Sequence, residues 1–98
     1  MKLKINGVAY QMDTLDTIKP SCSAGTISFT NKRIALAKSV YGKKRTKKEM
    51  QKTMWHEIVH GIFYEVGRKR LACDEKLVDD VAKAIIEVQE QLVQHGQA

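Results

Sequence analysis

Apolar and polar residues alternate in two short segments near the N-terminus, residues 2–5 and 8–12, which Asn6-Gly7 separates. Alternation with a period of two is typical of strands that bury one face. Asn-Gly favours a two-residue type I′ turn, because both residues tolerate positive φ. The pattern therefore predicts a β-hairpin, and its apolar side chains are Leu3, Ile5, Val8, Tyr10 and Met12.

A second pair of alternating segments covers residues 26–30 and 33–37 and is joined across Asn31-Lys32. Its apolar positions fall on one face and are Ile27, Phe29, Ile34 and Leu36. Residues 13–24 contain turn formers and the only proline, so we expect an irregular connection between the two pairs. Two N-terminal hairpins packed on helices predict an α+β domain with an antiparallel sheet.

The spacing of apolar residues becomes helical after a basic loop at residues 40–45. Thr46 and Glu49 can form a capping box, which satisfies free amides at a helix start. Apolar residues then form a broad stripe that comprises Met50, Met54, Trp55, Ile58, Val59, Ile62, Phe63 and Val66. Gly67, followed by basic residues, is typical of a helix end. We therefore predict a buried helix between Thr46 and Gly67.

A further helix is predicted after a turn at residues 68–73, and we expect it to end near Gln94. Its apolar face comprises Leu77, Val78, Val81, Ala82, Ala84, Ile85, Val88 and Leu92. The chain has 98 residues, of which 43% are hydrophobic. This length and composition predict one small domain over residues 1–98 with a modest core.

The first predicted helix carries the H-E-x-x-H motif His56-Glu57-Ile58-Val59-His60. Positions i and i+4 lie on one helix face, so both imidazoles can reach one metal ion. Glu57 lies beside them, where it can act as the general base on a zinc-bound water. One histidine on an apolar face is more often a core residue, but two that flank a buried acid favour a zinc site of the metallopeptidase kind.

A catalytic zinc needs a third protein ligand and one open position. The acids at the start of the second predicted helix are Asp74, Glu75, Asp79 and Asp80; they also suit the helix dipole. If the two helices run antiparallel about Gly67, Glu75 comes level with His60. We predict Glu75 as the third ligand. Asp79, one turn further on, is expected to orient a ligating imidazole through its distal N–H.

The remaining histidine and the two cysteines provide few alternatives. Cys22 and Cys73 form no C-x-x-C pair and are expected to be free thiols. Cys73 lies close to Glu75 in the sequence and stays an alternative ligand, whereas His95 is expected to be a solvated helix-end residue. The chain shows no apolar run that matches a membrane span and no signal-peptide pattern, which together with free thiols predicts a cytoplasmic protein.

Residues 56–60 and 75–82, the latter with the pattern E-x-x-V-D-x-V-A, resemble the two motifs of the ImmA/IrrE-type zinc metallopeptidases. The short phage- and prophage-encoded members are the most similar, and the resemblance extends over nearly the whole chain. It implies a small zincin-like domain with Glu57 as general base and three zinc ligands, which are His56, His60 and Glu75. It also implies a protein substrate such as a phage or stress-response repressor, because larger relatives cleave DNA-binding repressors.

The net charge of +6 comes largely from a basic stretch at residues 38–52. Its basic residues are Lys38, Lys43, Lys44, Arg45, Lys47, Lys48 and Lys52. A solvated surface accounts for such a stretch, and a patch for nucleic acid or an acidic protein is the alternative. Nucleic acid is the less favoured partner, because no interleaved aromatic residues or helix-turn-helix pattern accompany these charges.

Several functional features stay open at the level of the sequence. Tyr41 and Tyr64 are both candidates for the oxyanion donor, and the strand at residues 33–37 is expected to be an edge that can pair with an extended peptide. Two other classes of function are a non-catalytic, zinc-stabilised binding or inhibitor module of phage origin and a nucleic-acid-binding protein with a vestigial metal site. A closed coordination shell would favour the binding or inhibitor module. Salt-dependent DNA binding that persists without zinc would favour the nucleic-acid-binding protein.

Overall fold

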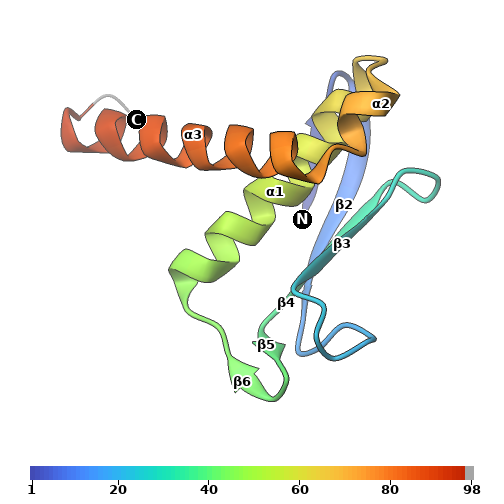
Figure 1. Cartoon of the computed structure of the whole chain (residues 1–98), viewed down its shortest axis with the longest axis vertical. Helices are drawn as coiled ribbons and strands as arrows, with labels where there is room; N and C mark the ends of the chain where they lie inside the picture. Colours follow the sequence, from blue (N-terminus) through green and yellow to red (C-terminus); the bar gives the residue numbers. More distant parts are fainter. Residues whose placement is uncertain (97–98) are drawn as a thin grey trace.

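The fold is α+β, as the sequence predicts. The computed structural model describes residues 1–96, and within them a four-stranded sheet is accompanied by three helices (Figure 1). The helices are α1 (Lys47–Glu65), α2 (Lys69–Ala72) and α3 (Glu75–Gln94). Helix α1 packs against the sheet and against α3, so it connects the two parts of the core.

The first hairpin is confirmed. Strand β1 (Lys2–Ile5) pairs antiparallel with β2 (Val8–Leu15). Asn6 and Gly7 both have positive φ, 49° and 81°, as a type I′ turn requires. This turn directs the apolar side chains of both strands to one face, where Ile5, Tyr10 and Met12 are buried.

The second hairpin is also present, but the sheet is mixed rather than antiparallel. Strand β3 (Gly25–Ser28) pairs antiparallel with β4 (Arg33–Ala37), and β4 pairs in parallel with β2. The strand order is β1-β2-β4-β3. Parallel strands need a long connection, which residues 16–24 together with β3 provide. The prediction that residues 33–37 form an edge strand is therefore wrong, because β4 is interior and β3 lies at the edge.

Two segments predicted as irregular contain regular structure. Strand β2 continues to Leu15, inside the connection expected at residues 13–24. The basic loop forms a small hairpin of β5 (Ser39–Val40) and β6 (Lys43–Lys44). Tyr41 and Gly42 have positive φ at its turn, so this hairpin repeats the backbone geometry of the first one.

Both ends of α1 follow the sequence signals. The Thr46 side chain accepts from the Glu49 amide, and the Glu49 carboxylate accepts from the Thr46 amide, which completes the capping box. At the other end Gly67 has φ of 84°, the Gly67 amide donates to the Tyr64 carbonyl, and the Arg68 amide donates to the Phe63 carbonyl. This is a Schellman arrangement, which explains why the helix ends there.

The core has two parts on opposite sides of α1. Between α1 and the sheet, buried apolar side chains form one cluster that comprises Ile5, Tyr10, Met12, Ile34, Leu36 and Ile58. Between α1 and α3, Val59 packs with Val78 and Ala82, and Trp55 and Phe63 pack partly against them. Residues 56–60 therefore lie on a helix that is held from both sides.

The chain between α1 and α3 contains the short helix α2, where the sequence predicts only a turn. Asp74 then caps α3 by accepting from the Leu77 amide. The predicted end of α3 near Gln94 is confirmed. Its predicted apolar face is fully buried only at Val78 and Ala82. The other predicted positions are half-buried at Leu77, Val81 and Ile85 and exposed at Ala84, Val88 and Leu92. None of the helices in residues 1–96 combines the length and apolar character that crossing a bilayer requires.

Candidate metal centre

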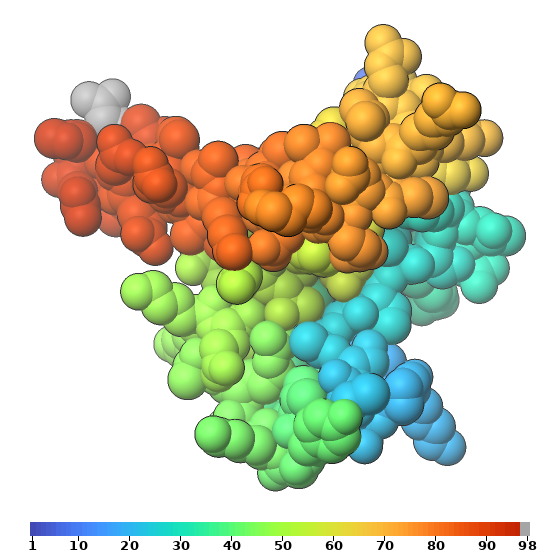
Figure 2. Space-filling view, viewed as in Figure 1, coloured from blue at the N-terminus to red at the C-terminus, as the bar shows by residue number. Residues whose placement is uncertain are grey.

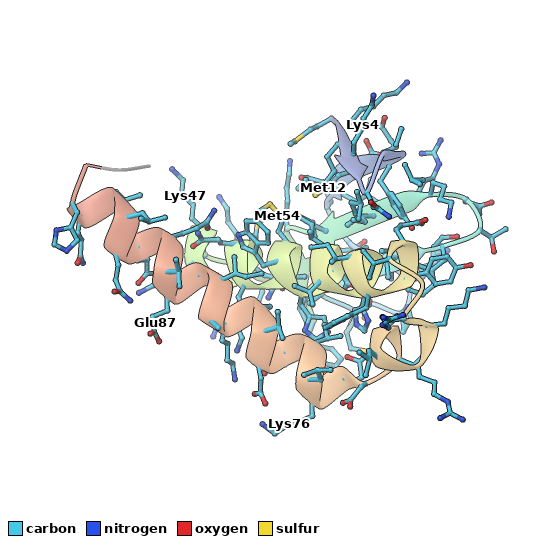
Figure 3. The ribbon with its side chains drawn as sticks, turned by 90° about the horizontal axis from the view of Figure 1, so that it is seen from above. Lys4, Met12, Lys47, Met54, Lys76 and Glu87 are labelled. Atoms are coloured by element: carbon cyan, nitrogen blue, oxygen red, sulfur yellow. The ribbon has the colours of Figure 1, made fainter. Side chains whose placement is uncertain are left out.

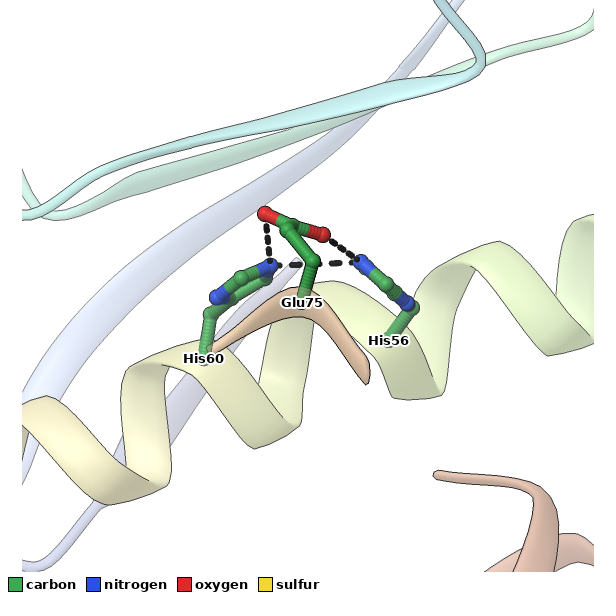
Figure 4. A group of neighbouring side chains, drawn as sticks. All are labelled: His56, His60 and Glu75. Carbon is green, nitrogen blue, oxygen red and sulfur yellow. Dashed lines mark hydrogen bonds and ion pairs between the residues drawn. The ribbon is translucent and has the colours of Figure 1, made fainter. Parts of the chain in front are cut away.

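Three side chains from two helices converge above the middle of α1 (Figure 4). His56 and His60 project from successive turns of α1, and their Nε2 atoms are 3.2 Å apart. The Glu75 carboxylate, from the first turn of α3, spans both rings. Its Oε2 lies 2.9 Å from Nε2 of His56, and its Oε1 lies 3.2 Å from Nε2 of His60. One ligand atom from each residue lies within 4.8 Å of the others.

The opposite nitrogen of each imidazole has an acceptor. Nδ1 of His60 donates to the buried backbone carbonyl of Ala72. A carbonyl only accepts, so this bond places the His60 ring proton on Nδ1. Nδ1 of His56 faces Oδ1 of Asp79 at 3.5 Å. Backbone carbonyls and carboxylates are the usual partners that orient metal-binding histidines. In neutral rings, both Nε2 lone pairs then point toward the carboxylate of Glu75.

This donor set fits a metal ion. Two imidazole lone pairs and two carboxylate oxygens are all acceptors, and a cation placed among them satisfies the whole group. Two histidines and one glutamate are a set that zinc accepts in catalytic sites, with a further position left for water. The Glu75 side chain is 71% exposed, whereas that of His60 is 8% exposed. The group is therefore anchored in the core on one side and open to solvent on the other.

Glu57 lies beside the histidines on α1 and is buried, with 7% of its surface exposed. Burial raises the pKa of its carboxyl, while the neighbouring His60 and His56 act in the opposite direction. Edge strand β3 comes close at Gly25. A Cβ atom there would lie 2.6 Å from Cγ2 of Thr53 and 3.0 Å from a Glu57 carboxylate oxygen. Glycine at this position therefore lets the strand edge approach the carboxylate of Glu57.

An open groove runs between β3 and α1 and passes the donor group. It consists of two hollows that share Gly25, His56 and Glu57. One hollow, of about 460 Å³, has the further lining residues Ile27, Phe29, His60, Ala72, Cys73 and Glu75. The other, of about 340 Å³, has the further lining residues Ala24, Arg45, Lys52, Thr53 and Asp79. The histidines are therefore reachable from solvent along the groove.

The structure brings together the site residues that the sequence singles out. His56, His60 and Glu75 form the donor group, Glu57 is adjacent, and Asp79 contacts His56. Asp79 also accepts from Lys83 at 2.8 Å, and this contact is the main reason that its pKa is lowered. Glu75 reaches the histidines from the very start of α3, and helix α2 occupies the segment where the sequence predicts only a turn.

The alternative residues lie elsewhere or play other parts. Cys73 lines the larger hollow but does not belong to the donor group, and Cys22 is an exposed free thiol. His95 caps the far end of α3 and is exposed. Tyr64 stacks on Phe29 with ring centroids 4.2 Å apart, and Tyr41 is 77% exposed at the β5–β6 turn. Neither tyrosine lines the two hollows of the groove.

Sequence reasoning missed four groups at the site. The Ala72 carbonyl orients His60, and Gly25 makes room for Glu57. Arg45 and Lys52, which the sequence analysis treats only as part of the basic stretch, line the smaller hollow. A backbone carbonyl leaves no trace in a sequence. The two basic side chains have no local pattern that separates them from their solvated neighbours.

Comparisons of the chain with protein-family models, with curated proteins and with solved structures found no match. The resemblance to the ImmA/IrrE-type metallopeptidases therefore stays a prediction from two motifs. The function is therefore inferred from how His56, His60, Glu75 and Glu57 are arranged.

Proposed function

We propose that this chain is a zinc-dependent metallopeptidase with a zincin-like site. The observation that carries the proposal is the convergence of two imidazole Nε2 atoms and the Glu75 carboxylate next to buried Glu57, at the floor of an open groove. His56, His60 and Glu75 would hold the ion. The same ligands and the same base follow from the resemblance to the ImmA/IrrE-type enzymes.

A zinc ion held there supplies Lewis-acid chemistry, which acidifies water and polarises a carbonyl. Glu57 accepts a proton from the attacking water and later donates it to the leaving amine. Its raised pKa suits that role, since a carboxylate that binds protons more tightly is a stronger base. Asp79 and the Ala72 carbonyl keep both imidazoles oriented during the reaction.

The substrate in this proposal is an extended segment of a protein that adds to the free edge of β3. Strand β3 is the edge strand next to α1, and its residues Gly25 and Ile27 line the groove. Backbone pairing with an edge strand binds a peptide independently of its sequence, and the lining side chains then provide specificity. A phage or stress-response repressor is the substrate class that the family resemblance implies.

The test of this proposal is Glu57→Gln, because it removes the base without removing a ligand. Purified zinc-loaded protein is incubated with repressor proteins from the same genome, and new termini are identified by mass spectrometry. We expect Glu57→Gln to keep its zinc and to cleave at least about 100-fold more slowly. Glu87→Gln, which makes the same change on the exposed surface of α3, serves as the control and should cleave at the unaltered rate. Equal cleavage by Glu57→Gln and the unaltered protein would contradict the peptidase assignment.

A further inference from the structure

Two basic side chains line the smaller hollow of the groove. Arg45 and Lys52 both line it, next to His56 and Glu57. Other basic residues of the 38–52 stretch, such as Lys43, Lys44 and Lys47, are exposed and do not line it. Arg45 is half-buried, whereas Lys52 is exposed like the other lysines of the stretch but lies at the hollow.

Arg45 is held in place but is not neutralised. Its Nη2 donates to the Glu49 backbone carbonyl at 3.3 Å, whereas its Nη1 is buried and has no hydrogen-bond partner. The nearby Glu49 carboxylate already accepts from the Thr46 amide at 2.8 Å in the capping box. Nη1 is enclosed by the protein, but the Arg45 side chain as a whole is only half-buried. A ligand can therefore reach its exposed part, where a carboxylate would form a charge-assisted hydrogen bond with the guanidinium.

The two acids that line the same hollow, Asp79 and Glu57, form no direct ion pair with Arg45 or Lys52. Asp79 is paired with Lys83, whose Nζ lies 2.8 Å from its Oδ2. Glu57 is buried on the floor of the groove and has the catalytic role proposed above. Arg45 and Lys52 form no ion pair with an acid anywhere in residues 1–96. Neither the guanidinium of Arg45 nor the ammonium of Lys52 is therefore held in a direct ion pair, although Lys52 lies close enough to Asp79 to help lower its pKa.

The opposite hollow has a different lining. Ile27 and Phe29 supply apolar surface there, and Glu75 supplies negative charge. Gly25 and Ile27 occupy alternate positions of β3, which places them about 6–7 Å apart on one face of the strand. The two ends of the groove thus present different chemistry to the two sides of an extended peptide.

We propose that the smaller hollow is an anion-binding specificity subsite, in which Arg45, assisted by Lys52, binds a carboxylate of the substrate close to the scissile bond. The inference rests on the proposed peptidase function and specifies its substrate class. The preferred peptide carries an acidic side chain, or a C-terminal carboxylate, on one side of the cleaved bond. It carries an apolar side chain, which fits against Ile27, on the other.

The test measures binding rather than cleavage. Zinc-loaded Glu57→Gln protein is titrated with labelled hexapeptides that are acetylated and amidated at their ends and that carry Glu or Gln at each position in turn. A second set has a free C-terminal carboxylate and no acidic side chain, which distinguishes a terminal from a side-chain carboxylate. We expect the best acid-bearing peptide to bind about tenfold more tightly than its amide twin, because charged hydrogen bonds are the stronger ones.

The double variant Glu57→Gln/Arg45→Gln should lose most of that preference while keeping its zinc and its thermal unfolding midpoint. Lys47→Gln in the same background removes one positive charge from an exposed neighbouring position and should keep the preference. Lys52→Gln should reduce it by a smaller factor. Raising the salt concentration should weaken the preference in every variant that has it.

Three results would overturn the inference: equal binding of acid and amide peptides, an unchanged preference after Arg45→Gln, or no peptide binding by zinc-loaded protein. The proposed function fails separately. If Arg45→Gln abolishes the acid preference but the unaltered protein cleaves no substrate, the results support the subsite and contradict the peptidase assignment. If the unaltered protein cleaves repressors without any preference for acids, the results contradict the subsite and support the peptidase assignment.

Discussion

The two halves of α3 have similar apolar spacing but very different surroundings. In the first half Val78 and Ala82 are fully buried against α1. In the second half Val88, Leu92 and Val93 are 53%, 42% and 65% exposed. Figures 1 and 2 show the reason: α3 passes over α1 near its start, and its far end, in red, extends beyond the rest of the molecule. In Figure 3, seen from above, the far end of α3 continues past the start of α1, where Lys47 is labelled.

The difference shows that the spacing of apolar residues predicts a helix face but not what covers it. The buried half is also the half that carries Glu75 and Asp79. Packing of Val78 and Ala82 on Val59 fixes the start of α3 against the middle of α1. This packing places the carboxylates of Glu75 and Asp79 next to the histidines of α1. The contact between the start of α3 and the middle of α1 therefore stabilises the fold and also assembles the donor group.

The largest effect is expected from a charge placed in the buried half. Val78→Asp should lower the free energy of unfolding by about 3–5 kcal/mol, because it buries an unpaired charge against Val59 and Ala82. Val93→Asp makes the same change in the exposed half and should alter stability by no more than about 0.5 kcal/mol. Urea unfolding of zinc-free protein measures both. Similar losses in the two variants would mean that the far half of α3 is also packed.

An intermediate effect is expected from the acid that faces His56. Asp79→Asn keeps the size of the side chain but weakens its interaction with Nδ1 of His56. Zinc should bind about 10–100-fold more weakly, which is the usual loss when a ligand's orienting partner is removed. A competition titration against a zinc chelator gives the affinity. Unchanged affinity would show that the contact, at 3.5 Å, does not orient the ring.

The smallest effect is expected one residue further along α3. Asp80 is exposed, and its one ion pair within residues 1–96 is with Lys76, an i,i+4 contact of 2.9 Å on the helix surface. Asp80→Ala should therefore cost about 0.3–0.5 kcal/mol of stability and leave zinc affinity unchanged. Thermal unfolding and the same chelator titration check this. A zinc affinity as low as that of Asp79→Asn would mean that a general loss of negative charge, rather than contact with His56, weakens the metal.

Local signals predicted the local structure well. Asn6-Gly7, the Thr46–Glu49 capping box and Gly67 each correspond to the turn, helix start or helix end that their backbone preferences favour. The strand order was not predictable from such signals. It depends on β4 lying beside β2, which pairs residues far apart in the chain, and the alternation of apolar residues is the same in either arrangement.

In the candidate site, too, the residues set by local geometry were predictable from the sequence, and those set by tertiary packing were not. His56, Glu57 and His60 come from one helical motif, so their arrangement follows from helix geometry alone. The positions of Glu75 and Asp79 depend on how α3 meets α1, and the short helix α2 between them has no signal in the apolar spacing. The Ala72 carbonyl, Gly25 and Arg45 reach the site only through tertiary packing. No pattern in the chain marks them before the fold is known.

In the function proposed above, His56, His60 and Glu75 together hold one zinc ion between α1 and α3. The most direct measurement is the zinc content per chain, by mass spectrometry after desalting, of the unaltered protein and of the Glu75→Ala and Asp80→Ala variants. We predict about one zinc per chain in the unaltered protein and in Asp80→Ala, and little zinc in Glu75→Ala, because two histidines alone hold the ion weakly. Full zinc content in Glu75→Ala, or none in the unaltered protein, would contradict the account.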